Sequence, residues 1–446
     1  MEEIISHLER RKWIDDSTCV TDDPRRVPTR PSLSGPGLVR VLKGGRVFTA
    51  TGEEAKEGTV VINRNRIHAI LSPDCLDWPD SAVVVDVSGK TVMPGLIDAH
   101  IHMSYTEPGL TMEIAQSTAD STLRSLERLR FYLESGVTSV RDAGSHADVP
   151  FRIKSWVREN RLPLPRVFAA GCLITGTGGH GAEGLSPVAA GFGKIREASG
   201  PDDWRSAVRE QFKKGADVIK IASHFSRDEV AAATDEAHTL GLKVMCDAET
   251  FYIQWAVEAG VDCIEHPLPR TDETIRLMAL RGTQSVPTLI PYCIIIDQFG
   301  GYFGSSSRRF TMSKEANLEV LRRMRQAGVT VGVGTDIVMD WFRYLPEAYI
   351  EELRLYVQAG FTVSEALEAA TRVNAQILDV GEILGTLEPG KLADVLVVDG
   401  CPDKDLDDLK NVNMVIRDGH VVLQDGRIYV ERHQGWPLDK KSKASW

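Results

Sequence analysis

Residues 91–103 read TVMPGLIDAHIHM, an apolar run that Pro94 and Gly95 interrupt and that closes on two histidines. The pattern predicts a short strand with His100 and His102 at its end. Because side chains alternate along a strand, both imidazoles should lie on one side, about 7 Å apart at their Cα atoms. Two nitrogens so spaced can bind one cation. A strand end can also carry two histidines without any ligand, so the rest of the chain has to decide between these interpretations.

The composition is that of an ordinary globular protein. The 446 residues are 42% hydrophobic and 26% charged, which suffices for one large and one smaller domain. The net charge of -11, without a basic block, argues against nucleic acid or an anionic membrane as a partner. We expect a small-molecule substrate, and a homo-oligomer is the common outcome for enzymes of this size.

The cysteines and the first residues bear on location. The seven cysteines show no C-x-x-C spacing, which predicts a reducing compartment without a disulfide scaffold. The opening MEEIISHLERRKW has no apolar core of a signal peptide, and no later segment reaches the roughly 18 apolar residues of a membrane span. These features predict a cytoplasmic protein.

The two ends of the chain carry matching β patterns. Short apolar runs between glycine turns occur over residues 36–92 and return over 383–432, which predicts two halves of one composite β-sandwich domain. Residues 1–35 are polar and proline-containing and are predicted to be an N-terminal extension. Residues 433–446 are predicted to form a C-terminal tail.

The middle, residues 93–382, alternates short apolar strands with amphipathic helices. We expect strands at LIDAHI, VTSVRD, RVFAAG, DVIKIA, LKVMCDA, DCIEHP, TQSVPTL and VTVGVGTD, and helices over residues such as 121–134, 228–240, 272–280 and 314–327. Eight such units predict an α/β fold, a (β/α)8 TIM barrel, whose functional groups lie at the carboxyl ends of the strands. The unusual residues fall at those ends: His100, His102, Lys220, Asp247, His266 and Asp336.

Lys220 stands inside an apolar strand that should be buried on both faces. Burial favours the neutral amine, which can react with carbon dioxide to give a carbamate that bridges two divalent cations. A lone lysine of this kind more often extends its tip to solvent. The carbamate is the better interpretation only because His100, His102, His266 and Asp336 fall at neighbouring strand ends.

Three further residues have a catalytic and a structural interpretation. His266 ends a strand before a proline, where it can ligate a cation or make a structural hydrogen bond. Asp336 follows a glycine-rich strand and can ligate a cation and accept a water proton, or it can cap the next helix. His180, in TGTGGHG, can reach a reacting carbonyl or belong to a flexible turn.

These segments together resemble a known family. PGLIDAHIH, VIKIA, AGVDCIEHP, VPTL, VGVGTD, ALEAATRVNAQIL and LGTLEPGKLADVLVVDG are similar to the metal-dependent amidohydrolase superfamily, in its branch of imidazolonepropionases, Xaa-Pro dipeptidases and ochratoxin-hydrolysing amidases. The resemblance implies a barrel with a composite β-sandwich and a binuclear centre of divalent metal, zinc or else manganese. It also implies a carbamate on Lys220, Asp336 as the base, and hydrolysis of an amide or related C–N bond.

The chain departs from that branch at two places. The fifth strand ordinarily supplies a histidine, whereas this chain has Asp247, with Glu249 two residues later. A carboxylate ligates zinc or manganese but lowers the positive charge available to activate water. Asp247 can therefore complete an altered second site, leave a one-ion enzyme, or mark lost activity. The loop after Lys220 is shorter than expected, and its His224 is either in the pocket or exposed.

Rival functions remain at this point. A deaminase of the same superfamily is disfavoured because those enzymes usually lack a lysine in the fourth strand, where this chain has Lys220. A metal-dependent decarboxylase or other C–C bond enzyme is a second rival, which Asp247 makes less remote. A metal-poor pseudoenzyme is the alternative in which the chain is not an enzyme.

Overall fold

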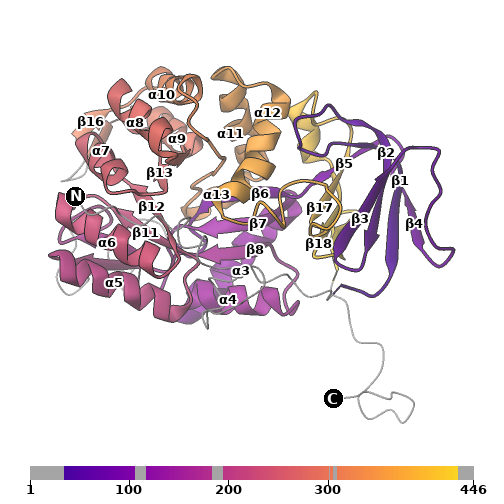
Figure 1. Cartoon of the computed structure of the whole chain (residues 1–446), viewed down its shortest axis with the longest axis horizontal. Helices are drawn as coiled ribbons and strands as arrows, with labels where there is room; N and C mark the ends of the chain where they lie inside the picture. Colours follow the sequence, from indigo (N-terminus) through magenta and orange to yellow (C-terminus); the bar gives the residue numbers. More distant parts are fainter. Residues whose placement is uncertain (1–34, 106–116, 183–193, 301, 305–308, 430–446) are drawn as a thin grey trace, which may run out of the picture.

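The fold is described from a computed structural model of the chain. The structure describes residues 35–105, 117–182, 194–300, 302–304 and 309–429. The predicted N-terminal extension therefore lies outside the described residues except for its last residue, and the predicted C-terminal tail lies wholly outside them. Figure 1 shows a β-rich part at one end of the molecule and alternating strands and helices over the rest.

The β-rich part joins the two ends of the described chain in one sheet. Its nine strands run in the order β20-β19-β18-β17-β5-β1-β2-β3, with β4 also paired to β1. Strands β5 and β17 pair antiparallel and join the N-terminal half of this sheet to its C-terminal half. Lys90 lies opposite Asp399 at one end of the pair, and Pro94 lies opposite Val395 at the other. The strands are β1 (Val39–Val47), β2 (Lys56–Asn63), β3 (Arg66–Leu71), β4 (Val83–Asp86), β5 (Lys90–Pro94), β17 (Val395–Asp399), β18 (Val412–Arg417), β19 (His420–Gln424) and β20 (Arg427–Ile428).

Two further sheets are made of parallel strands. One sheet has the order β6-β7-β8 and a second has β10-β9-β11-β12-β13-β14. Their strands are β6 (Leu96–Ile101), β7 (Val137–Asp142), β8 (Arg166–Ala169), β9 (Leu173–Gly176), β10 (Ile195–Ala198), β11 (Val218–Ala222), β12 (Lys243–Asp247), β13 (Cys263–Glu265) and β14 (Gln284–Val286). A separate hairpin pairs β15 (Tyr302–Gly304) with β16 (Arg309–Thr311).

The segment over residues 329–336 lies between β14 and β6. On one side the Ser285 N–H donates to Thr330 O, and on the other the Ala99 N–H donates to Val333 O. This segment was predicted to be the eighth strand, but only an isolated bridge from Ser285 to Val331 forms there. Its glycines explain the close approach, because a Cβ on Gly334 would lie 2.7 Å from His100 Cβ.

Helices alternate with the parallel strands and surround them in Figure 1. Several begin at a residue whose side chain caps the first turn, and Ser226 with Glu229 forms a capping box at α6. The helices are α3 (Thr118–Glu134), α4 (Val149–Arg158), α5 (Pro201–Lys214), α6 (Arg227–Thr239), α7 (Phe251–Glu258), α8 (Asp272–Arg281), α9 (Leu289–Phe299), α10 (Lys314–Gln326), α11 (Glu347–Gln358), α12 (Val363–Glu368) and α13 (Asn374–Ile377). Short 3₁₀ segments span Met339–Tyr344 and Leu406–Lys410, and a π segment spans Ala369–Val373.

The predicted elements match these bounds closely. LIDAHI and VTSVRD coincide with β6 and β7, and the four predicted helices correspond to α3, α6, α8 and α10. RVFAAG gives only β8, and the chain resumes pairing as β9 after a break at residues 170–172. None of the described helices combines the length and the apolarity that a membrane span needs.

Asp98 fastens β6 to the 329–336 segment. Its carboxylate accepts hydrogen bonds from the His100 N–H (3.1 Å), the Thr335 N–H (3.0 Å) and the Thr335 hydroxyl (2.6 Å). The side chain is fully buried, and burial raises the pKa of Asp98 to about 7 against the opposing effect of these hydrogen bonds. The register of the strand that bears the histidines therefore depends on this carboxylate.

We expect Asp98→Ala to destabilise the protein by about 3 kcal/mol or more, because three buried donors lose their acceptor together. Differential scanning calorimetry should show a lowered Tm. Asp77→Asn, on an exposed loop, is the control and should leave the Tm unchanged. An Asp98→Ala variant with the parental Tm would refute the role given to this carboxylate.

Candidate metal centre

The predicted site residues gather where the parallel strands end. His100 lies in β6, Lys220 in β11 and Asp247 at the last position of β12. His266 comes directly after β13, and Asp336 ends the 329–336 segment. His102 follows β6 by one residue, on the same side as His100 as the alternation predicted, and the two rings are 5.3 Å apart between centroids.

Fixed acceptors orient the two histidines of the opening motif. His100 Nδ1 lies 2.6 Å from Glu265 Oε2, and His102 Nδ1 lies 2.8 Å from the carbonyl oxygen of Gly144. A carboxylate and a carbonyl can only accept, so each Nδ1 carries the proton and each Nε2 keeps its lone pair. Burial, with a smaller effect of Lys220, lowers the pKa of His102 to about 3 and that of His100 well below its usual value. Both rings are therefore neutral and able to ligate.

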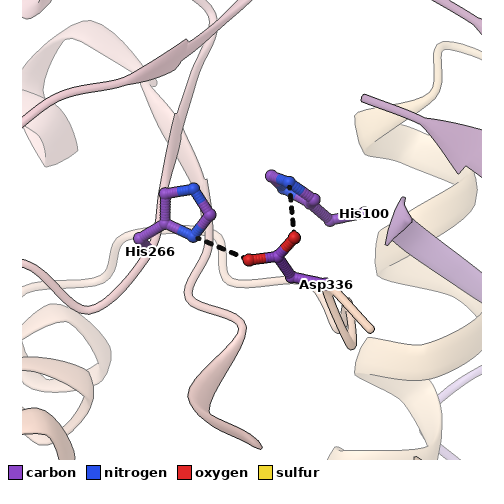
Figure 2. Close-up of side chains that lie close together, drawn as sticks. All are labelled: His100, His266 and Asp336. Atoms are coloured by element: carbon purple, nitrogen blue, oxygen red, sulfur yellow. Dashed lines mark ion pairs between the residues drawn. The ribbon is translucent and has the colours of Figure 1, made fainter. Parts of the chain in front are cut away.

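Asp336 lies between these rings and His266, as Figure 2 shows for His100 and His266. Its Oδ1 is 3.5 Å from His100 Nε2 and 3.4 Å from His102 Nε2, and its Oδ2 is 3.8 Å from His266 Nδ1. Burial raises the pKa of Asp336 well above its usual value. The ligand atoms of His100, His266 and Asp336 all lie within 4.8 Å of one another, a spacing that suits a metal ion.

Lys220 is buried in β11, every residue of which is buried, as the sequence predicted. Its Nζ has no hydrogen-bond partner among the described residues, and neither has His100 Nε2. The lysine lies close enough to lower the pKa of both His100 and His102. Burying an amine and an imidazole lone pair without hydrogen bonds costs free energy, which is expected of groups that bind a ligand.

Asp247 joins two imidazoles through one oxygen. Its Oδ2 is 3.1 Å from His266 Nε2 and 3.2 Å from His180 Nε2. The His180 loop is not a free turn, because the His180 N–H donates to Ser223 O and the Gly176 N–H donates to His224 O. The structure thus brings His180 to the carboxylate that replaces the expected fifth-strand histidine.

Comparison with known proteins gives the family. The model for the amidohydrolase family matches residues 91–422, most of the chain. The chain belongs to the amidohydrolase family. Hydrolysis of C–N bonds is the activity of its homologues, and the chain is accordingly an enzyme of that type.

Similar proteins cover nearly the same length. The ochratoxinase of Aspergillus niger is 26% identical over 434 residues, which cover 87% of this chain and 88% of that protein. An imidazolonepropionase of Geobacillus thermodenitrificans is 28% identical over 415 residues, covering 84% and 92%. The crystal structure of a prolidase complexed with N-methylphosphonate-L-proline is 30% identical, with a TM-score of 0.76 and coverage of 86% and 100%. These relatives fall in the branches that the motifs indicated.

His224 of this amidohydrolase contacts Glu249 and Tyr252. Its Nε2 is 3.6 Å from Glu249 Oε1, and its ring packs edge-on against Tyr252 with centroids 5.0 Å apart. Glu249 is buried and accepts a hydrogen bond from the Ser223 hydroxyl at 2.7 Å. His224 is thus neither a free surface residue nor a neighbour of Asp336 in the described contacts.

Sequence reasoning missed the residues that hold the ligands. Glu265 is fully buried, and its carboxylate binds His100 at one oxygen and the Arg141 guanidinium at 2.9 and 3.1 Å. Thr288 Oγ1 lies 2.8 Å from His266 Nδ1. A charged residue within the apolar strand CIEH was a usable signal for Glu265, whereas no local pattern marks Thr288.

Strained backbone concentrates at the same strand ends. His266, Thr288 and Asp336 have φ of 66°, 48° and 45°, in the left-handed region that non-glycine residues rarely adopt. Such conformations persist only where the surroundings over-determine them, which is common at functional sites. The donors present, three imidazoles with carboxylates and a buried amine, are a fitting set for one or two divalent cations.

We expect Glu265→Gln to weaken cation binding about 10- to 100-fold, because an amide N–H₂ donor replaces one of the two carboxylate oxygens that accept from His100 and Arg141. Competition of the purified protein with a zinc chelator measures this affinity. The control, Glu258→Gln, removes a carboxylate from α7 that pairs with Arg227 and should leave the affinity unchanged. Equal affinity in the parent and Glu265→Gln would contradict the orienting role.

Proposed function

We propose that the chain is a metal-dependent hydrolase that cleaves an amide or related C–N bond in a small molecule. The substrate class is an N-acyl amino acid, a dipeptide-like compound or a cyclic amide, as the activities named for its relatives suggest. The observation that carries the proposal is the convergence of His100, His102, His266 and Asp336 near Lys220, whose Nζ has no hydrogen-bond partner among the described residues.

We assign the ligands as follows. His100, His102 and Asp336 would hold one cation, Asp247 and His266 would hold a second, and Lys220, as a carbamate, would contribute an anionic ligand to both. Zinc suits this mixture of nitrogen and oxygen donors, and manganese is the alternative where Asp247 replaces an imidazole. Divalent cations here supply a Lewis acid that polarises the carbonyl and lowers the pKa of water.

The protein groups move the protons. Asp336 accepts a proton from the attacking water and delivers it to the leaving nitrogen, since its oxygens already face three imidazoles across 3.4–3.8 Å. His180 Nε2–H, now directed to Asp247, can donate to the oxygen of the carbonyl as negative charge develops there. The Nδ1 contacts of His100 and His102 keep both rings in the ligating tautomer throughout.

We also propose that the parallel strands close into a (β/α)8 barrel. In support, β8 pairs with β7 while the following β9 pairs with β11, and the 329–336 segment bonds to both β14 and β6. The barrel would span residues 93–382, with the composite β-sandwich domain formed by 36–92 and 383–432. The cytoplasmic location and a homo-oligomeric state stay predictions.

We expect the purified protein to contain one to two equivalents of divalent metal, and Lys220→Ala or Asp336→Ala to lower turnover by about a thousandfold or more. Elemental analysis and hydrolysis of a panel of N-acyl amino acids and dipeptides measure the two effects. Lys243→Ala, at the opposite end of the neighbouring strand β12, is the matched control. Near-native turnover of Lys220→Ala at unchanged metal content would overturn the assignment.

The alternative is a metal-dependent decarboxylase or other C–C bond enzyme, which the carboxylate of Asp247 makes less remote. Incubation with N-acyl amino acids and with aromatic carboxylates separates the two functions by product. We expect released amine and no carbon dioxide, together with loss of about one metal equivalent in Asp247→Ala. Carbon dioxide without amine would favour the alternative, and a parent protein that binds no divalent metal would favour the pseudoenzyme.

A further inference from the structure

We propose that Glu352, on α11, is a positioning residue for His266 and hence for the second cation site. It caps helix α9 in place of Thr288, which leaves the Thr288 hydroxyl free to orient the imidazole. The inference rests on the proposed function, because it concerns a ligand of the cation site assigned there.

The start of α9 is capped from another helix. Thr288 occupies the N-cap position, yet its side chain makes no capping hydrogen bond. Instead, the Leu289 N–H donates to Glu352 Oε1 at 2.9 Å and the Ile290 N–H donates to Glu352 Oε2 at 2.7 Å. Glu352 is fully buried, so its carboxylate is committed to these two donors at the positive end of the helix dipole.

Thr288 is held in a conformation that it would not adopt alone. Its φ and ψ are 48° and 61°, which is unfavourable for a β-branched residue. The two hydrogen bonds from the next two residues to Glu352 fix the backbone on the carboxyl side of Thr288. A cap made by Thr288 itself would turn its hydroxyl toward the N–H of the second or third helical residue and away from His266.

The hydroxyl determines how the His266 ring faces the site. Thr288 Oγ1 is 2.8 Å from His266 Nδ1, and the opposite nitrogen, Nε2, is 3.1 Å from Asp247 Oδ2. When the hydroxyl accepts from Nδ1–H, the lone pair of Nε2 is directed to the side of Asp247, where the second cation is proposed. Glu352 thus acts on His266 through the helix start and Thr288, without touching the site.

A double-mutant cycle tests this route. Thr288→Ala and Thr288→Ser differ only by the hydroxyl, and Glu352→Gln keeps the size of the side chain but offers an amide N–H₂ to one of the two N–H donors. The readout is the rate of zinc release from the loaded protein to a chromophoric chelator. We expect Thr288→Ala and Glu352→Gln each to release one zinc equivalent about tenfold faster, and Thr288→Ser to behave like the parent.

The double variant gives the decisive comparison. If Glu352 acts through the Thr288 hydroxyl, Glu352→Gln adds no further acceleration in the Thr288→Ala background. Acceleration by the same factor in both backgrounds would mean a direct electrostatic effect of the lost charge and would overturn the proposal. Parental release rates in Glu352→Gln would overturn it as well.

Two controls separate positioning from stability. Ile350→Val removes one buried methyl group from the same helix, and it should lower Tm without changing zinc release. Glu351→Gln removes a neighbouring exposed carboxylate and should change neither. Faster release in Ile350→Val would show that loss of stability alone loosens the site, which would contradict a specific role for Glu352.

Measurements on the parent protein distinguish failure of the positioning role of Glu352 from failure of the proposed function. A parent without bound zinc after loading would refute the proposed centre itself. A parent with two zinc equivalents and amide hydrolysis, together with parental release in Glu352→Gln, would leave the function standing and refute only the positioning role.

Discussion

The Asp98 carboxylate is the contact on which the arrangement of the site depends. It binds the main chain of His100 and both polar groups of Thr335, so it fixes the strand of the paired histidines against the segment that ends in Asp336. Strand β6, which carries His100, follows shortly after Pro94 and β5, and β5 joins the two halves of the nine-stranded sheet. One short stretch of chain therefore ties the β-rich part to the candidate metal centre.

The sequence predicted the elements and the site where the physical signal was local. Period-two alternation placed His100 and His102 on one side of β6, and the apolar run around Lys220 predicted its full burial. Glycines in VGVGTD predicted the close approach of this segment to β6, although only one isolated bridge forms there instead of a regular strand. Local patterns suffice for such features because each one involves neighbours in the chain.

The supports of the site could not be predicted because they join residues distant in sequence. Glu265 reaches His100 over 165 positions, and Glu352 reaches the start of α9 over 63. Nothing near Thr288 in sequence indicates that Glu352 caps helix α9 or that the Thr288 hydroxyl contacts His266 Nδ1. The pairing of His180 with Asp247 was equally hidden, since it needs two loops to be bonded through Ser223 and His224.

Charge explains what the replacement of an imidazole by Asp247 does to the proposed centre. With the carbamate, Asp247 and Asp336 all ionised, two divalent cations leave one net positive charge, and a single cation leaves one net negative charge. An imidazole in place of Asp247 would leave two positive charges or none. Since uncompensated charge is costly in a buried site, Asp247 favours loading of the second cation more than a histidine would. In the proposed centre the same carboxylate would weaken the field on a developing oxyanion, which would make donation by the neighbouring His180 more important for turnover.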